Sequence, residues 1–447
     1  MDNLTVGTSL SQYDSAFPEP EVRRQFVVAY IGLLLFVTVY YARPNDWIPG
    51  VTFFPFARIA AAIGLLGLIG SFFSNLRATT ARLFRFRPTQ LLLLLYFWTW
   101  VTIPFASWRG GAFQVVMEVY SEVIAISVLV LLSVTDVGRL RKLLFVSIVP
   151  ATIASVFAMR DFVYLMQGRI VSKYDDRIAG IFQNVFSNPN DLALNVVVLL
   201  PFCCAFAILS SGLKKLFWWT CAGLMIGGVI ASFSRGGFLA LVAGAGVVLL
   251  RTKGTRRFFF VFLLIAALAA LLVISPGGFL DRISTILNPD KDLTGSANAR
   301  LSILIMSLQL TAEHPIVGLG PGNFDSVTKT WHGTHNIYTE FSSEAGILAL
   351  IVFLLLLRQA FKFAKRATRS ADRDIAVFGS AALVSLVILA VGTFFYSGAY
   401  QFFTYFPICY AFVLGRMAES TVPSVDEKES SDLQEFAADA VHDNPFI

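Results

Sequence analysis

The chain has 447 residues, of which 56% are hydrophobic and 14% are charged. Soluble domains carry about a quarter charged residues, so this composition excludes an ordinary soluble protein. Apolar runs of roughly 15 to 22 residues recur along the chain, which is the length needed to cross a hydrocarbon core. The net charge of +6 does not indicate nucleic-acid binding, because the cationic residues lie in loops beside the apolar runs, as membrane topology requires.

These runs predict an all-α polytopic membrane protein with about twelve transmembrane helices. The first run follows a mixed leader at residues 1–25 that has neither a basic start nor a small-residue cleavage site, so we expect a retained anchor. The four cysteines (Cys203, Cys204, Cys221 and Cys409) all lie in apolar segments and predict no disulfide framework. The expected spans lie near residues 26–41, 53–73, 89–107, 113–133, 143–159, 191–211, 216–232, 237–250, 258–275, 345–357, 377–394 and 402–416.

The distribution of basic residues predicts the orientation. With a cytoplasmic N-terminus, the short outer loops hold only Arg43, Arg109 and Arg235. An even number of spans then places both termini in the cytoplasm, and residues 417–447 form a disordered acidic cytoplasmic tail. The inner loops hold the remaining clusters, namely Arg77, Arg82, Arg85 and Arg87; Arg139, Arg141 and Lys142; Lys214 and Lys215; Arg251, Lys253, Arg256 and Arg257; and Arg358, Lys362, Lys365, Arg366, Arg369 and Arg373.

Two outer segments, at residues 160–190 and 276–342, are much longer than the other connections. Long loops in a chain that is otherwise nearly all membrane carry function. We therefore expect spans one to nine within residues 26–275, a partly helical periplasmic catalytic loop at 276–342, and spans ten to twelve within residues 343–416.

The long loop contains three of the four histidines, His314, His332 and His335. His335 directly precedes the tenth span, and Glu340 and Glu344 follow it at intervals of about one helical turn. A histidine in this position can act as a general base near neutral pH. A surface or helix-capping histidine is the alternative interpretation.

Three arginines on the outer side are candidate anion contacts. Arg300 lies near the start of a predicted helix capped by Ser296 or Asn298, and a helix N-terminus with an arginine can bind phosphate. Arg235 lies in a very short connection close to the hydrocarbon boundary, where a charge is costly unless it is paired or faces a wet cavity. Arg177 is a further candidate. An ordinary first-turn arginine and an interfacial snorkelling arginine are the alternatives for Arg300 and Arg235.

Two other groups have a structural interpretation beside a functional one. The turn with Gly318, Gly320 and Gly322 could let the backbone approach a ligand, but a plain connector is the preferred interpretation. Arg58, Glu118 and Glu122 lie in the outer halves of the second and fourth spans. They predict a buried ion pair under an outward-facing cavity in preference to direct chemistry.

Several short motifs follow one another along the chain: Tyr41-Ala42-Arg43-Pro44, Arg177 with Gly180 and Asn188-Pro189-Asn190, Ser234-Arg235-Gly236-Gly237, Arg300, His314-Pro315, Gly318-Leu319-Gly320-Pro321-Gly322, His335-Asn336 and Glu344-Ala345-Gly346. In these motifs and their order the sequence resembles the O-antigen ligase and polymerase superfamily of bacterial envelope enzymes. The resemblance extends from about residue 26 to residue 416. The branch described as O-glycosylation ligases is the most similar at the first element and at the cluster before the sixth span.

The resemblance implies a GT-C-like, inverting, metal-independent glycosyltransferase of the bacterial inner membrane with no cofactor. Its donor would be a glycan on undecaprenyl diphosphate at the periplasmic face. His335 would activate the acceptor hydroxyl, whereas Arg235, Arg300 and Arg177 would bind the diphosphate. Supporting roles fall to Glu344, Asn336, Asn190, Arg58 and Glu118.

The acceptor stays open at this stage. A ligase for lipid A–core in lipopolysaccharide biosynthesis, a polymerase that extends a polysaccharide, and a transferase to protein all fit the resemblance. A transporter of polysaccharide or lipid is the alternative from another class. It would need polar residues near the bilayer centre that connect both faces, whereas the charges within the predicted spans lie in their outer halves.

Overall fold

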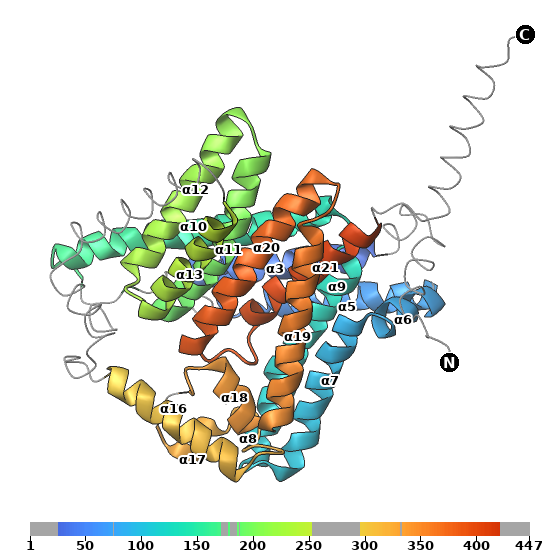
Figure 1. The fold of residues 1–447 in the computed structure, drawn as a ribbon, viewed down its shortest axis with the longest axis vertical. Coiled ribbons are helices and arrows are strands. Elements are labelled where there is room, and N and C mark those ends of the chain that lie inside the picture. Colours follow the sequence, from blue (N-terminus) through green and yellow to red (C-terminus); the bar gives the residue numbers. More distant parts are fainter. Residues whose placement is uncertain are drawn as a thin grey trace, which may run out of the picture.

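The computed structural model describes residues 26–74, 76–170, 178, 186, 188–252, 296–330 and 333–420, and these form helices and turns without a strand (Figure 1). The first half contains α3 (Val27–Ala42), α4 (Pro44–Trp47), α5 (Phe56–Ser74), α6 (Leu76–Phe84), α7 (Arg87–Thr102), η1 (Ile103–Phe105), α8 (Arg109–Gln114), η2 (Val115–Tyr120), α9 (Ser121–Ser133) and α10 (Val137–Met166). The second contains α11 (Pro189–Leu209), α12 (Gly212–Ala231), α13 (Arg235–Arg251), α16 (Ser296–Glu313), α17 (Phe324–Thr328), α18 (Ile337–Glu344), α19 (Gly346–Ala367), α20 (Arg373–Gly392), η4 (Thr393–Phe395) and α21 (Phe402–Ser420).

Eight helical segments in the described ranges are long and apolar enough to cross a membrane. This confirms the prediction of an all-α polytopic membrane protein. Each expected span overlaps a helix, except the ninth near residues 258–275, which lies outside the described residues. The leader at 1–25, most of the expected acidic tail, Arg177 and His332 also lie outside them.

Small residues set how closely the helices pack. A Cβ added to Gly32 on α3 would lie 2.1 Å from the backbone nitrogen of Gly64 on α5, so the two helices touch backbone to backbone. A Cβ added to Gly228 on α12 would likewise lie 2.4 Å from the Cβ of Ser155 on α10, so a larger residue would not fit there. Close approach at small residues is how membrane helices associate where the hydrophobic effect between them is weak.

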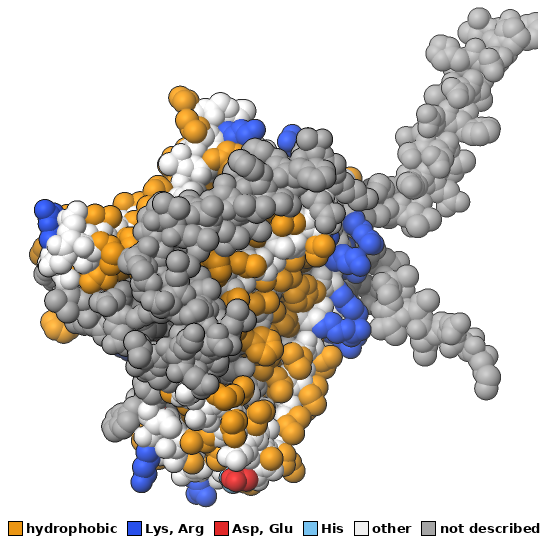
Figure 2. Space-filling model, turned by 60° about the vertical axis from the view of Figure 1, so that its left-hand side comes forward, with side chains coloured by type: hydrophobic (Ala, Val, Ile, Leu, Met, Phe, Trp, Pro, Cys, Tyr) orange, Lys and Arg blue, Asp and Glu red, His pale blue; other side chains and the backbone are white. Residues whose placement is uncertain are grey.

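The helices α11, α20 and α21 occupy the centre of the bundle. Most of α11 is buried, and Ser385 on α20 donates a 2.8 Å hydrogen bond to the carbonyl of Val198 on α11. Large apolar side chains instead cover the outside, as Figure 2 shows for one face, where lysine and arginine gather near the margins. Examples are Phe73 and Leu66 on α5, which are 89% and 66% exposed. Such a surface is suited to lipid rather than water.

The helices α16, α17 and α18 lie together at one end of the bundle (Figure 1). The hydroxyls of Thr311 on α16 and Ser342 on α18 are 2.9 Å apart, which joins these two helices. α18 leads directly into α19 through Ala345, so the end of a long membrane helix carries the described part of the expected catalytic loop.

Candidate functional site

His335 lies immediately before α18 in a strained backbone conformation. Its φ is +50°, in the left-handed region that non-glycine residues rarely adopt. Asn336 caps α18 by accepting hydrogen bonds from the N–H groups of Tyr338 at 2.9 Å and Thr339 at 3.3 Å. The backbone N–H of His335 donates to the hydroxyl of Ser397 at 2.7 Å. The half-buried imidazole is therefore carried by a backbone held on both sides.

Two carboxylates on α18, those of the half-buried Glu340 and the buried Glu344, each hold a different loop. Glu340 accepts the backbone N–H groups of Gly398 at 2.8 Å and Ala399 at 3.0 Å. Glu344 accepts those of Gly322 at 2.7 Å and Phe324 at 3.2 Å. Burial, together with the nearby charge of Glu344, raises the pKa of Glu340 to about 8. Burial also raises the pKa of Glu344 to about 7.

The glycine-rich turn is packed against this helix. Gly318 and Gly320 have φ values of +67° and +99°, and Gly320 donates to the carbonyl of Glu344 at 2.8 Å. A Cβ on Gly318 would lie 2.3 Å from the carbonyl carbon of Glu344, and one on Gly320 would lie 2.3 Å from the Cβ of Ala106. The glycines are required by backbone conformation and close packing, which favours the connector interpretation of this turn.

Arg235 occupies the first position of α13, in a turn tied to α11. The hydroxyl of Ser234 donates to the side-chain oxygen of Asn190 at 2.8 Å and accepts the N–H of Gly237 at 3.2 Å. A Cβ on Gly237 would lie 2.4 Å from that of Ala193 on α11. The two glycines therefore allow the turn that carries Arg235 to pack directly against the N-terminal part of α11. Arg235 itself is half-buried.

Residues 395–397 connect the Arg235 turn with His335. A Cβ on Gly236 would lie 2.7 Å from the Cβ of Phe395, and the hydroxyl of Ser397 accepts the N–H of His335. Tyr396 between them is extended, with φ −147° and ψ 134°, so the two attachment points are about 7 Å apart along the chain. The structure thus brings the backbones of Arg235 and His335 to the two ends of one short segment.

Arg300 lies about one turn into α16 and is half-buried. Because α16 begins at Ser296, Asn298 lies inside the helix and cannot be its N-cap. α16 reaches the site end of the bundle through its contact with α18 at Ser342. Arg177 falls outside the described residues.

Arg58 and Glu118 do not form the expected buried pair. Both residues are exposed, and the carboxylate of Glu118 accepts a 3.2 Å hydrogen bond from the side chain of Gln114. Arg58 is instead near enough to Glu122 to interact with it electrostatically. The expectation of burial was wrong, because both side chains lie on exposed sides of their helices, which depends on how the helices pack and not on the apolar runs.

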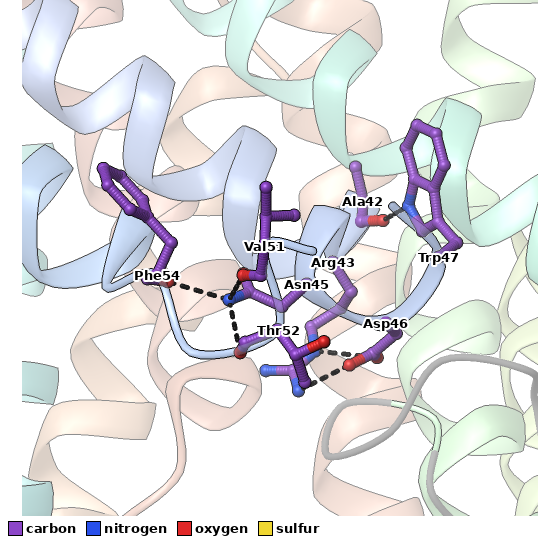
Figure 3. Close-up of polar contacts among 8 residues, drawn as sticks. All are labelled: Ala42, Arg43, Asn45, Asp46, Trp47, Val51, Thr52 and Phe54. Carbon is purple, nitrogen blue, oxygen red and sulfur yellow. Dashed lines mark hydrogen bonds and ion pairs between the residues drawn. The ribbon is translucent and has the colours of Figure 1, made fainter. Parts of the chain in front are cut away.

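The first sequence element, at residues 41–44, begins a loop held by several polar contacts (Figure 3). Arg43 has a φ of +49° and forms an ion pair with Asp46, whose two oxygens accept its Nε at 3.1 Å and Nη2 at 3.2 Å. The side-chain amide of Asn45 donates to three carbonyls, those of Val51, Thr52 and Phe54. Tyr40, beside this loop, interacts electrostatically with both Arg43 and Asp191 on α11.

Ser397 was not among the site residues expected from the sequence. It is a serine in a short turn after an apolar span, and its only signal is its position on the predicted outer side. Asp46 was not expected either, because its ion pair with Arg43 depends on the conformation of the loop.

Residues 220–354 match the family model described as O-antigen ligase. This segment is therefore similar to O-antigen ligases, which supports the resemblance seen in the sequence. The matched segment begins within α12, ends within α19 and contains Arg235, Arg300, His335, Asn336 and Glu344. No curated protein matches the chain. Members of this family are glycosyltransferase-like ligases and polymerases. The long apolar helices identify the chain as a multi-pass membrane protein.

Proposed function

We propose that the chain transfers a glycan from undecaprenyl diphosphate to an acceptor hydroxyl at the periplasmic face of the bacterial inner membrane. The observation that carries this proposal is the arrangement around residues 395–397, where the turn of Arg235 and the backbone of His335 converge. A cationic side chain and a proton acceptor at one membrane boundary suit a reaction whose leaving group is a lipid-linked diphosphate.

The reaction is a single displacement at the anomeric carbon. The acceptor oxygen forms a bond to that carbon, and the bond between the carbon and the diphosphate oxygen breaks, which inverts the configuration. His335 takes the proton of the acceptor hydroxyl as a general base. Undecaprenyl diphosphate leaves with the bonding electron pair, and Arg235 and Arg300 stabilise its charge through paired N–H donors, without a metal ion. Arg177 is a third candidate for the same role.

The distribution of charge along α19 supports the periplasmic placement. This helix begins beside α18 and ends with Lys365 and Arg366 in its last turn. Its 22 residues span about 33 Å, enough to cross the hydrocarbon core. Because basic residues mark the cytoplasmic side, the candidate site at the opposite end faces the periplasm, and we place both termini in the cytoplasm.

The supporting residues divide into two groups. Asn336 caps the helix after His335, Glu344 holds the glycine-rich turn, and Asn190 holds the Arg235 turn through their observed hydrogen bonds. Arg58 and Glu118 lie on the exposed outer flank, and we assign them no part in the chemistry.

The decisive experiment measures glycan transfer in membrane vesicles that contain undecaprenyl-diphosphate-linked glycan. The variant His335→Ala should lower the transfer rate by about 10²- to 10⁴-fold, the usual contribution of a general base. His314→Ala is the matched control, because His314 is an exposed histidine of the same loop. Unchanged transfer by a correctly inserted His335→Ala protein would exclude the proposed mechanism.

The acceptor is tested separately by the glycan phenotype of a deletion strain. Intact polymer that is no longer attached indicates a ligase, whether the acceptor is lipid A–core or protein. Single-unit glycans indicate a polymerase. Normal glycans that accumulate on the cytoplasmic side would instead indicate a transporter.

A further inference from the structure

The left-handed backbone of His335 needs support from outside its own helix. A non-glycine residue in this region costs about 1–3 kcal/mol, and such strain persists only where the surroundings impose it. On the C-terminal side, Asn336 fixes the start of α18. On the other side, the N–H of His335 meets the hydroxyl of Ser397, a residue 62 positions away.

Ser397 lies in the connection between η4 and α21, so its own position must also be set. The carboxylate of Glu340 accepts the N–H groups of the next two residues, Gly398 and Ala399, through a single oxygen, Oε2. α21 holds the carbonyls of the same two residues through the hydroxyls of Thr404 at 2.8 Å and Tyr405 at 2.9 Å. The connection is thus held from α18 on one side and from α21 on the other.

We propose that Glu340 and Ser397 are positioning residues for His335. Hydrogen bonds and backbone together form a closed circuit. It runs along α18 from His335 to Glu340, by hydrogen bonds to Gly398 and Ala399, along the backbone to Ser397, and by a hydrogen bond to the N–H of His335. The circuit fixes the imidazole relative to the Arg235 turn, because Phe395, which packs on that turn, lies two residues before Ser397. This inference rests on the proposed function, in which His335 is the general base.

Glu344 shows why the role belongs to Glu340 in particular. Both carboxylates lie on α18 and both accept two backbone N–H groups, but Glu344 binds Gly322 and Phe324 of the glycine-rich turn. Glu344 also interacts with the side chain of Tyr400 in the same connection, but of the two glutamates only Glu340 bonds to the residues next to Ser397. The two glutamates therefore have the same chemistry and different targets.

The test combines transfer kinetics with hydrogen exchange of peptides that contain the His335 amide, in the full-length protein. Ser397→Ala removes the acceptor for that amide, so its exchange should become at least about tenfold faster, the effect of about 1.4 kcal/mol. The transfer rate at saturating donor should fall about tenfold, while KM for the undecaprenyl-diphosphate-linked donor stays within about twofold. Glu340→Ala should behave similarly.

Glu340→Gln distinguishes positioning from a need for charge. The amide oxygen of glutamine can accept both N–H groups, so this variant should retain most of the transfer rate and the slow exchange. Two matched controls lie away from the site. Asp372→Asn changes a carboxylate that also accepts two successive backbone N–H groups, at 2.7 and 3.2 Å, and Ser385→Ala removes a buried 2.8 Å hydroxyl hydrogen bond. Neither control should alter exchange at His335.

The outcomes separate this inference from the proposed function. Unchanged exchange at His335 in Ser397→Ala overturns the positioning role, even if transfer declines. Faster exchange with an unchanged transfer rate also overturns it, because the circuit would then be without catalytic effect. If the wild-type protein transfers no glycan, or if His335→Ala transfers glycan as fast as wild type, the proposed function fails, whatever the hydrogen exchange shows. If Glu340→Ala does not accumulate, Ser397→Ala alone decides the question.

Discussion

The hydroxyl of Ser234 donates a 2.8 Å hydrogen bond to the side-chain oxygen of Asn190, and this bond ties the turn that carries Arg235 to the first turn of α11. The two residues are 44 positions apart in the chain. Asn190 also donates its own backbone N–H to the side chain of the capping residue Asn188. The Arg235 turn is therefore bonded to a residue that a helix cap already holds in place.

Loss of this tie should weaken both the stability of the Arg235 turn and glycan transfer. Ser234→Ala removes both the bond to Asn190 and the cap on Gly237, which together are worth about 1–2 kcal/mol. We expect transfer to fall about three- to tenfold in the vesicle assay. Thr220→Ala on α12 is the control, because its exposed hydroxyl bonds only to Leu216 within the same helix. Equal rates for Ser234→Ala and wild type would contradict the prediction.

The close contact between α13 and α11 predicts a steric effect at Gly237. Gly237→Ala places a methyl group 2.4 Å from the Cβ of Ala193, a contact that only a shift of the helices can relieve. We expect a loss of about 1–3 kcal/mol, as for other overpacked sites, and reduced transfer because Arg235 moves with the helix. Gly246→Ala in the same helix has no atom within 4 Å of the added methyl group and should not lower the thermal unfolding temperature.

Gly346, where α18 gives way to α19, should tolerate no side chain. Its φ is +84°, and an added Cβ would lie 1.9 Å from the carbonyl oxygen of Ile316. Gly50→Ala separates conformational strain from the clash, because Gly50 has a φ of +85° and open space around it. Gly50→Ala should cost about 1–2 kcal/mol, whereas Gly346→Ala should prevent accumulation of folded protein. Similar yields for both variants would show that the clash is relieved elsewhere.

The buried carboxyl of Glu340 predicts stability that declines with rising pH. Its pKa is raised from 4.5 to about 8, by burial first and then by Glu344, with Asp325 adding to the repulsion. The native state therefore binds more protons than the unfolded state between these two pH values, and stability is lost as pH rises through this window. The unfolding temperature in detergent, measured from pH 5 to 9, should fall.

Glu340→Gln should make that pH dependence shallower, because the glutamine carries no titratable proton. Glu344 continues to titrate in this variant, with a pKa raised to about 7, so part of the slope should remain. An unfolding temperature whose pH dependence is identical in the variant and wild type would assign the effect to other groups.

The hydrogen bonds of Asn45 in the loop of Figure 3 predict an order of stability among variants of this residue. The amide nitrogen donates to the carbonyls of Val51, Thr52 and Phe54 at 3.1, 3.0 and 2.8 Å. Asn45→Ala removes the donor and should destabilise the protein by about 1–3 kcal/mol. Asn45→Asp should be worse, because it places a carboxylate among three carbonyl oxygens. A more stable aspartate variant would show that the loop rearranges.

The positions of the apolar helices could be predicted from the sequence because they depend on local properties. The expected span at 191–211 corresponds to α11 at Pro189–Leu209, which Asn188 caps. The length of an apolar run and the charges beside it act on each helix independently of the rest of the chain. The motifs likewise pointed to His335 and Arg235 as candidates, although their roles stay predictions.

Only the tertiary structure shows what surrounds these candidates. The contact between His335 and Ser397, the different loops held by Glu340 and Glu344, and the exposure of Arg58 depend on how helices distant in sequence pack together. A hydrogen bond across 62 positions leaves no periodic pattern in either segment. Hydrophobicity therefore determines which segments enter the membrane, whereas the close packing of small residues and the pairing of buried polar groups decide which residues meet at the site.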